Sequence, residues 1–329
     1  MSTETRDMPS IQNSRGPLKP KKARTVMKGH REASMMWGYL AVMTAAACWG
    51  TSGIFIQLIM TQIDIPAAAL AFWRDTAAFL AFSCISGMFR RREELRIQKS
   101  DRIWLILMGF SLGLFHVSWN LGIFLNGPAI TTVQQAAMPV IVILVARIVW
   151  QEAFTVRKIA AVTLIATGTI LVSGLISSVR NEVTTAGIAA GFSVPATYAA
   201  WSIFGKQLSG RYAPEVVLTY AFGIAALVLL PFQFFVASPL PVPPQTWLCF
   251  AGLIGLSTVA GFFAFAFGLK HLPAGVATVL VMSEILFVSV YAYSLWGEMM
   301  TPIESFGALL VICGVVALLQ RRKYRPTED

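Results

Sequence analysis

The sequence predicts an all-α, polytopic membrane protein of ten transmembrane helices, built as two inverted five-helix repeats. Three observations lead to this prediction. The chain has 329 residues, of which 56% are hydrophobic and 13% are charged, whereas a soluble domain is about 25% charged. Its apolar residues gather in ten long runs, and the pattern of the first five runs returns in the last five.

Each run is long enough to cross a bilayer as a helix, which takes roughly 20 apolar residues because the hydrocarbon is about 30 Å thick. Strands of a membrane barrel would instead show alternating segments of about ten residues. The ten predicted spans are 35–58, 66–89, 103–124, 128–148, 157–176, 185–205, 214–237, 246–269, 273–296 and 302–320. Turns are predicted between them, for example at Asn126-Gly127-Pro128.

The basic residues predict the orientation. With a cytoplasmic N-terminus, 24 of the 26 Lys and Arg residues fall in inside segments or tails. This bias predicts a protein of the cell membrane whose two termini both lie on the cytoplasmic side. We interpret 1–34 as a basic disordered tail and 321–329 as a second cytoplasmic tail. Because the positive charges flank apolar runs, the net charge of +10 does not indicate a nucleic-acid partner.

The internal repeat defines two units, 35–178 and 179–320. At an offset of 146 residues, several residues recur in register: Gly109 with Gly255, Trp150 with Trp296, Glu152 with Glu298, Thr155 with Thr301, and Gly168 with Gly314. Small residues also recur wherever helices pack closely, but the tryptophan and glutamate matches make chance a poor explanation. Because each unit holds an odd number of spans, the second is inverted, as in many secondary transporters.

Three charged residues lie well inside the predicted spans, where a charge costs about 2.5–3.5 kcal/mol or more. Glu284 is interpreted either as a site for a substrate amine or a proton, or as a protonated acid hydrogen-bonded within the bundle. Arg74 either pairs with Glu284 or extends outward to the cavity mouth. Asp75 lies about 100° from Arg74 around the helix, so one of the two is expected to be structural.

Uncharged polar residues add further site candidates. His116 and Asn120 share a helix face, and His116 is either a proton-coupling group or a packing histidine. Gln134 and Gln135 either bind a polar solute or join helices by hydrogen bonds.

Deep aromatic residues and prolines complete the candidates. Trp49, Trp119 and Tyr198 would suit an apolar or aromatic part of a solute, or simply pack in the core. Pro139 and Pro195 are candidate helix breaks or hinges. The four cysteines form no CxxC motif, and no HExxH motif is present, so neither a metal site nor a cofactor is expected.

Several of these stretches resemble the drug/metabolite transporter superfamily, in its EamA-type ten-helix group. The similar stretches include Cys48–Ser52, Phe72–Asp75, Met138-Pro139 with Gln151-Glu152, and Glu284-Ile285 with Gly297-Glu298. Each half keeps only part of the group's acidic-Pro pair, and the first half lacks the Gly before Glu152. The resemblance implies a secondary transporter with a central cavity, often an exporter of amino acids or other metabolites.

The predicted function is therefore alternating-access transport of a small metabolite such as an amino acid, with export as the expected direction. No GxxxxGK[ST] loop is present, so the energy would come from a gradient. The expected partners are a small solute, the lipid bilayer and a coupling proton. A non-transporting receptor or scaffold is the alternative, and an enzyme is not expected. The sequence leaves the substrate, the coupling ion and the oligomeric state open.

Overall fold

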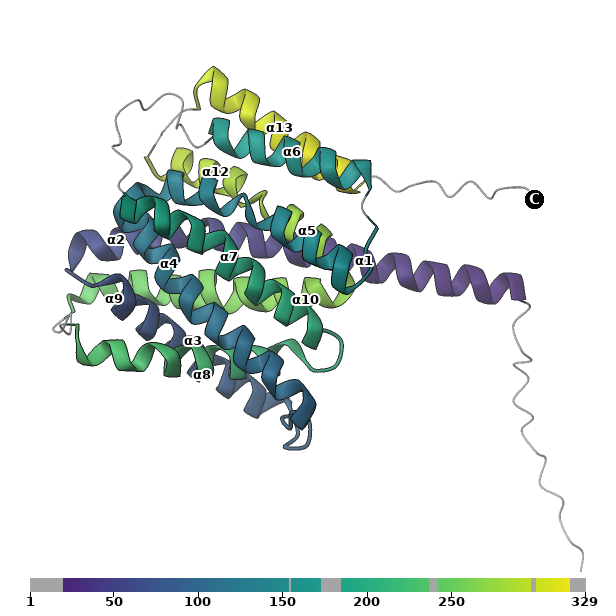
Figure 1. The fold of residues 1–329 in the computed structure, drawn as a ribbon, viewed down its shortest axis with the longest axis horizontal. Coiled ribbons are helices and arrows are strands. Elements are labelled where there is room, and N and C mark those ends of the chain that lie inside the picture. Colours follow the sequence, from purple (N-terminus) through teal and green to yellow (C-terminus); the bar gives the residue numbers. More distant parts are fainter. Residues whose placement is uncertain (1–19, 154, 173–184, 237–241, 297–299, 320–329) are drawn as a thin grey trace, which may run out of the picture.

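The computed structural model describes residues 20–153, 155–172, 185–236, 242–296 and 300–319. Its regular elements are helices throughout these ranges (Figure 1). Seven of them are long and apolar enough to cross a membrane, and the shorter Pro302–Leu318 is also apolar. The chain is therefore polytopic and all-α, and the count of ten spans stays a prediction.

The first half holds α1 (Pro20–Gly50), α2 (Ser52–Gln62), α3 (Ala67–Phe89), α4 (Arg102–Gln135), α5 (Met138–Val149) and α6 (Val156–Val172). The second half holds α7 (Thr185–Leu208), α8 (Pro214–Leu229), α9 (Pro244–Gly252), α10 (Gly261–His271), α11 (Ala274–Val281), α12 (Glu284–Trp296) and α13 (Pro302–Leu319). Short segments η1 (Lys99–Asp101), η2 (Leu230–Phe234) and the π-helical η3 (Leu253–Ala260) connect them.

Helix α1 begins earlier than the sequence predicted. Residues 20–34, which were assigned to a disordered tail, form its first turns, and the purple helix projects beyond the bundle (Figure 1). Proline is favoured at the first position of a helix, and the following Lys, Ala, Arg and Met residues are good helix formers. Residues 1–19 and 320–329 lie outside the described part of the chain.

Helix α4 contains a reversal of the chain. A Cβ added at Gly122 would lie 2.8 Å from Cγ2 of Thr131, although nine residues of straight helix would separate them by about 13 Å. The backbone therefore turns between these residues while keeping helical hydrogen bonds. This is where the sequence predicted a turn at Asn126-Gly127-Pro128.

Two helices are interrupted at matching positions. Helix α4 gives way to α5 at Ala136–Ala137, and α11 gives way to α12 at Met282–Ser283, 146 residues later. Pro139 lies in the first turn of α5, directly after the first interruption. By contrast, α7 continues through Pro195, so the break predicted there is absent. A single proline removes one backbone bond, which neighbouring groups can compensate in a membrane helix.

Equivalent helices of the two halves make equivalent packing contacts. Helix α4 packs along α7, and its counterpart in the second half, α10, packs along α1. The equivalent helices α3 and α8 pack on each other, as do α6 and α13. Figure 1 shows α6 and α13 side by side at one edge of the bundle. The α4–α7 pair therefore corresponds to the α10–α1 pair. The α3–α8 and α6–α13 pairs each join two equivalent helices.

Glycines allow the close contact of α6 and α13. A Cβ at Gly168 would lie 2.5 Å from the carbonyl oxygen of Gly307, and a Cβ at Gly307 would lie 2.8 Å from that of Gly168. Backbones that touch this closely leave no room for any larger residue. The reciprocal contact explains why small residues occur at these positions, as membrane helix interfaces require.

Candidate functional site

A buried cavity lies between the two halves, where the interrupted helices meet. About 20 Å³ of it can hold the centre of a water molecule, within about 300 Å³ of space between the atoms that includes open solvent. Helices α1, α2, α3 and α4 contribute lining residues from the first half, and α7, α10 and α12 contribute them from the second. The lining side chains are Trp49, Ser52, Arg74, Phe115, Trp119, Gln135, Tyr198, Phe262 and Glu284.

Arg74 brings a guanidinium group to the cavity from α3, and only 2% of the residue is exposed. Its Nε donates a hydrogen bond to Oγ1 of Thr258 at 2.7 Å. Thr258 lies in the π-helical segment η3, and its hydroxyl donates in turn to the carbonyl of Leu253 at 2.7 Å. The side chain is thus held inside the bundle, and the outward extension considered from the sequence does not occur in this structure.

Glu284 brings a carboxylate to the same cavity as the first residue of α12. Nε2 of Gln135 donates to its Oε2 at 3.3 Å. The start of a helix also favours a negative charge, because the helix dipole is positive there. Within the described residues, no ion pair of 4.0 Å or less joins Arg74 to Glu284. The base and the acid therefore face one cavity without neutralising each other directly.

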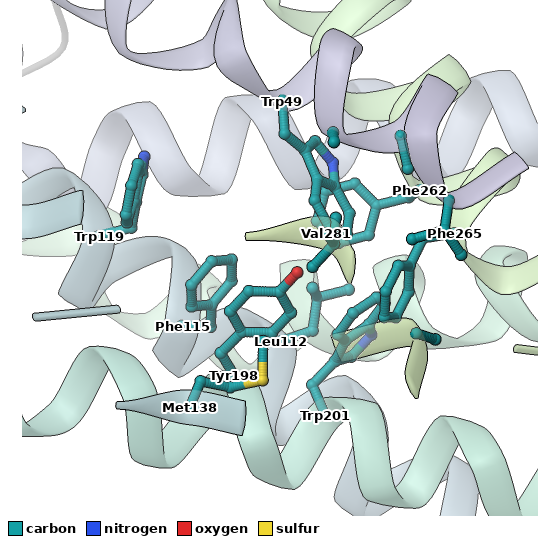
Figure 2. Close-up of a cluster of buried hydrophobic side chains, with 14 of the residues drawn as sticks. Trp49, Leu112, Phe115, Trp119, Met138, Tyr198, Trp201, Phe262, Phe265 and Val281 are labelled. Carbon is teal, nitrogen blue, oxygen red and sulfur yellow. The ribbon is translucent and has the colours of Figure 1, made fainter. Parts of the chain in front are cut away.

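Aromatic rings form the rest of the wall (Figure 2). Trp49 makes edge contacts with Tyr198 and Phe262 at ring-centre distances of 5.8 and 5.0 Å. Phe115 lies 4.8 Å from Tyr198, and Figure 2 shows the Tyr198 hydroxyl pointing inward between Phe115 and Trp49. Such a wall can hold an apolar or aromatic group of a solute.

Three polar atoms of the lining are buried without a hydrogen-bond partner among the described residues. They are Nε1 of Trp49, Oγ of Ser52 and the hydroxyl of Tyr198. Buried polar groups in native proteins are nearly always paired. These atoms are therefore available to hydrogen-bond a polar ligand.

Asp75 and His116 form a separate buried pair beside the cavity. Nδ1 of His116 lies 2.5 Å from Oδ1 of Asp75, and both side chains are fully buried. Neither residue lines the cavity, but Phe262, which does, packs edge-on against the His116 ring at 5.4 Å. Arg74 and Asp75 thus turn to different partners, as their angular separation on the helix predicted.

The structure brings six of the nine predicted site residues to the cavity: Glu284, Arg74, Trp119, Gln135, Trp49 and Tyr198. The other three point elsewhere. His116 binds Asp75, Asn120 donates to the carbonyl of Ala67 at 3.1 Å, and Gln134 donates to the carbonyl of Gly187 at 3.5 Å.

Sequence reasoning missed Ser52, Phe115, Phe262 and Thr258 as site residues. Ser52 lies in the quoted stretch Cys48–Ser52, so that motif was an available signal. Thr258 carried no such signal, because hydroxyl residues are common in membrane helices and only the π-helical turn directs this one to Arg74. The described residues hold no cluster of three His, Cys, Asp or Glu side chains that could bind a metal.

The model of the EamA-like transporter family matches residues 36–174 and 185–320. The chain belongs to the EamA-like transporter family. Among relatives of this EamA-like protein, the uncharacterized inner membrane transporter YicL of Salmonella typhimurium (strain LT2) is 25% identical over 298 residues, covering 88% of this chain and 97% of YicL. The uncharacterized transporter YwfM of Bacillus subtilis (strain 168) is 26% identical over 158 residues, about half of each protein.

A solved structure titled "Crystal structure of protein" resembles this EamA-like protein with a TM-score of 0.72 at 19% identity, covering 88% of this chain and 99% of that one. This likeness supports the fold alone. The family and the names of its relatives point to a membrane transporter of a small molecule, rather than to an enzyme.

Proposed function

We propose that this EamA-like protein is a secondary transporter that moves a small zwitterionic metabolite, such as an amino acid, by alternating access. Export is the direction that the family resemblance implies. One observation supports the zwitterion most strongly: Arg74 and Glu284 line a single cavity and are not ion-paired to each other.

In this proposal, the solute carboxylate binds near Arg74, because guanidinium groups match carboxylates in geometry and charge. The solute ammonium binds near Glu284, which Gln135 orients. The aromatic wall around Trp49 accommodates an apolar side chain, and the hydroxyls of Ser52 and Tyr198 supply further hydrogen bonds. A proton that binds Glu284 when the ammonium leaves would couple transport to a pH gradient.

Alternating access requires two halves that can exchange their roles. The matching interruptions before Met138 and Glu284, and the helix pairs that exchange with the halves, support two inverted repeats of five spans each. We further propose that the protein crosses the cell membrane ten times and that both termini lie in the cytoplasm.

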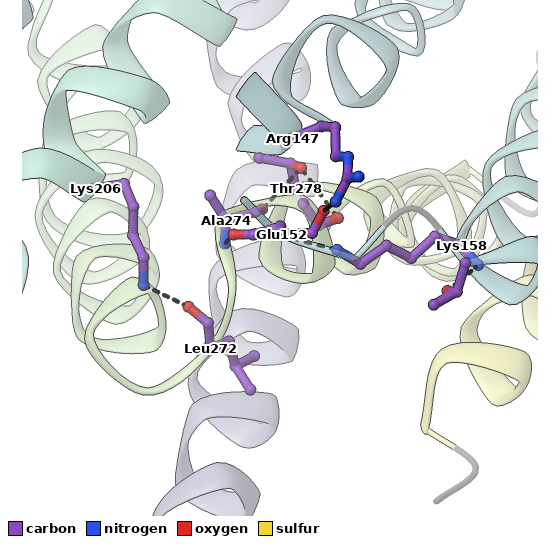
Figure 3. Close-up of polar contacts among 9 residues, drawn as sticks. Arg147, Glu152, Lys158, Lys206, Leu272, Ala274 and Thr278 are labelled. Carbon is purple, nitrogen blue, oxygen red and sulfur yellow. Dashed lines mark hydrogen bonds and ion pairs between the residues drawn. The ribbon is translucent and has the colours of Figure 1, made fainter. Parts of the chain in front are cut away.

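A polar contact joins the two halves at the start of α11 (Figure 3). Oε1 of Glu152, from the first half, accepts the backbone N–H of Ala274 at the start of α11 at 3.0 Å. Nζ of Lys158 supports the same carboxylate at 2.9 Å. Nearby, Nζ of Lys206 donates to the carbonyls of Leu269 and Leu272 at 2.6 and 2.7 Å. We assign the Glu152–Ala274 contact as a latch on the cytoplasmic side of the cavity.

Flux of radiolabelled neutral amino acids in proteoliposomes, with and without a pH gradient, tests the proposed function. Wild-type protein should transport at least one of them, and Glu284→Gln should lower the flux or abolish its dependence on the gradient. Asp64→Asn, the same acid-to-amide change at an exposed position, is the matched control and should transport normally. Binding of amino acids without any flux would instead favour the receptor alternative.

A further inference from the structure

A second, larger cleft lies away from the transport cavity, between the segment that follows α3, the first turns of α4 and the middle of α8. Its space amounts to about 1450 Å³ and is open to the surroundings. The residues that matter here are Arg92, Arg96, Arg102, Ile106, Tyr220 and Ile224. The cleft therefore combines three guanidinium groups with an apolar wall.

Close packing of α4 on α8 forms the inner end of this cleft. A Cβ at Gly109 would lie 2.6 Å from Cβ of Ile224, so the helices touch there. At the outer end, the Tyr220 hydroxyl donates to the carbonyl of Leu95 at 2.8 Å. This bond holds the segment that follows α3 against α8. The cleft is thus a formed part of the fold, bounded at both ends by direct contacts.

The positive charges of the cleft are not used by neighbouring acids. Arg92, Arg96 and Arg102 are exposed, and in the described part of the chain none of them forms an ion pair. Three of the four acids close by pair with other arginines, and Glu93, the fourth, forms no ion pair among the described residues. Glu215 and Glu94 pair with Arg90 at 2.5 and 3.1 Å, and Asp101 pairs with Arg211 at 2.7 Å. The hydrogen bonds that Arg90 donates to Glu215 and then to Glu94 raise the pKa of Arg90.

The apolar side of the cleft continues along the helices toward the membrane. Ile106 is 51% exposed, and Phe110, one turn further along α4, is 47% exposed. In a membrane-spanning helix such exposed apolar side chains contact lipid tails. A ligand that fills both parts of the cleft must therefore carry an anionic head and a hydrocarbon tail.

We propose that this cleft binds one anionic phospholipid, whose phosphate contacts Arg92, Arg96 and Arg102 and whose acyl chain lies along Ile106 and Ile224. Arginine forms paired hydrogen bonds with phosphate oxygens, which suits it to this role. The basic segment is one that the positive-inside pattern assigns to the cytoplasmic leaflet, where anionic lipids attract basic residues. This inference does not depend on which solute the protein transports.

The test is lipid binding to the purified full-length protein in detergent, measured by native mass spectrometry with phosphatidylglycerol and with phosphatidylcholine. The cleft variant is Arg92→Gln/Arg96→Gln/Arg102→Gln, with each single change measured too. The matched control is Arg91→Gln/Lys99→Gln/Lys270→Gln, which removes three exposed basic groups outside the cleft. Inorganic phosphate and Ile106→Asn form two further arms.

The wild-type protein and the control should retain phosphatidylglycerol at least about tenfold more tightly than the cleft variant, and phosphatidylcholine should be retained weakly by all three. Ile106→Asn should weaken lipid binding while leaving any phosphate binding unchanged. The proposal is overturned if the control loses the lipid as completely as the cleft variant, or if both lipids are retained equally. It is also overturned if inorganic phosphate displaces the lipid at equal concentration, because the site would then bind a free anion.

Discussion

The side-chain amide of Gln135 donates a hydrogen bond to the carboxylate of Glu284 across 3.3 Å. Gln135 is the last residue of α4, and Glu284 is the first residue of α12. The bond therefore joins the interrupted helix of one half to the interrupted helix of the other. It places the acid of the cavity at the contact between these two helices.

Replacing Gln135 with Leu should lower the apparent affinity for the solute roughly tenfold or more. A hydrogen bond to a charged group contributes about 1.5–3 kcal/mol, and without it the Glu284 carboxylate loses its orientation. The concentration dependence of flux in proteoliposomes measures this effect. Gln134→Leu is the matched control, because the Gln134 amide faces the Gly187 carbonyl and not the cavity. Equal losses in both variants would show that the bond to Glu284 has no special role.

Removing one partner of the Asp75–His116 pair should destabilise the fold by about 1–3 kcal/mol, because the remaining polar group is left buried and unpaired. Asp75→Leu and His116→Leu should each lower the free energy of unfolding in detergent. The double variant should lose clearly less than the sum of the two, which a double-mutant cycle measures. Strict additivity would show that the two residues do not interact.

Gly168→Ala should destabilise the packing of α6 on α13. The added Cβ would lie 2.5 Å from a backbone carbonyl, which cannot move aside without shifting a helix, and overpacking typically costs about 1–3 kcal/mol. Gly87→Ala is the control, since nothing lies within 4 Å of its Cβ position in α3. Gly168→Ala should lower the midpoint of thermal unfolding, and Gly87→Ala should leave it unchanged or raise it slightly. A Gly168→Ala protein as stable as wild type would contradict the close contact.

Glu152→Ala should open the proposed latch more often. The lost cap on the first N–H of α11 corresponds to about 1 kcal/mol, or roughly a fivefold change in the open population. The reporter is Ala274→Cys in a protein whose four native cysteines are replaced by Ser, labelled with a membrane-impermeant maleimide. Glu94→Ala, an exposed acid paired with Arg90, should label at the parental rate. A Glu152→Ala protein that labels no faster would remove this contact from the proposed mechanism.

Sequence reasoning predicted the helical, polytopic fold, because a run of about 20 apolar residues has only one stable conformation in lipid. It also predicted Arg74 and Glu284 as site residues, since charges are rare at membrane depth. Trp49 was predicted with them as a deep aromatic residue. It could not place His116 or Asn120. Both share a face of α4, yet side chains on that face reach α3 and not the cavity, and only the packing of α3 on α4 decides this.

The helix interruptions were predictable only in part. Pro139 marks the break in the first half, but no proline accompanies the equivalent break before Glu284, and Pro195 lies in an unbroken helix. Proline is therefore neither necessary nor sufficient for an interruption here. The repeat offset of 146 residues was the better signal, because it relates the second break to the first.

The central claim is that one cavity recognises both charges of a zwitterion, and inhibition of transport by three related compounds tests it most directly. The compounds are a neutral amino acid, the amine that lacks its carboxylate and the acid that lacks its ammonium group. We expect wild-type transport to be inhibited best by the amino acid, Arg74→Gln to lose its preference for the carboxylate, and Glu284→Gln to lose its preference for the ammonium group. If both variants rank the three compounds as the wild type does, Arg74 and Glu284 do not bind the solute and the account is wrong.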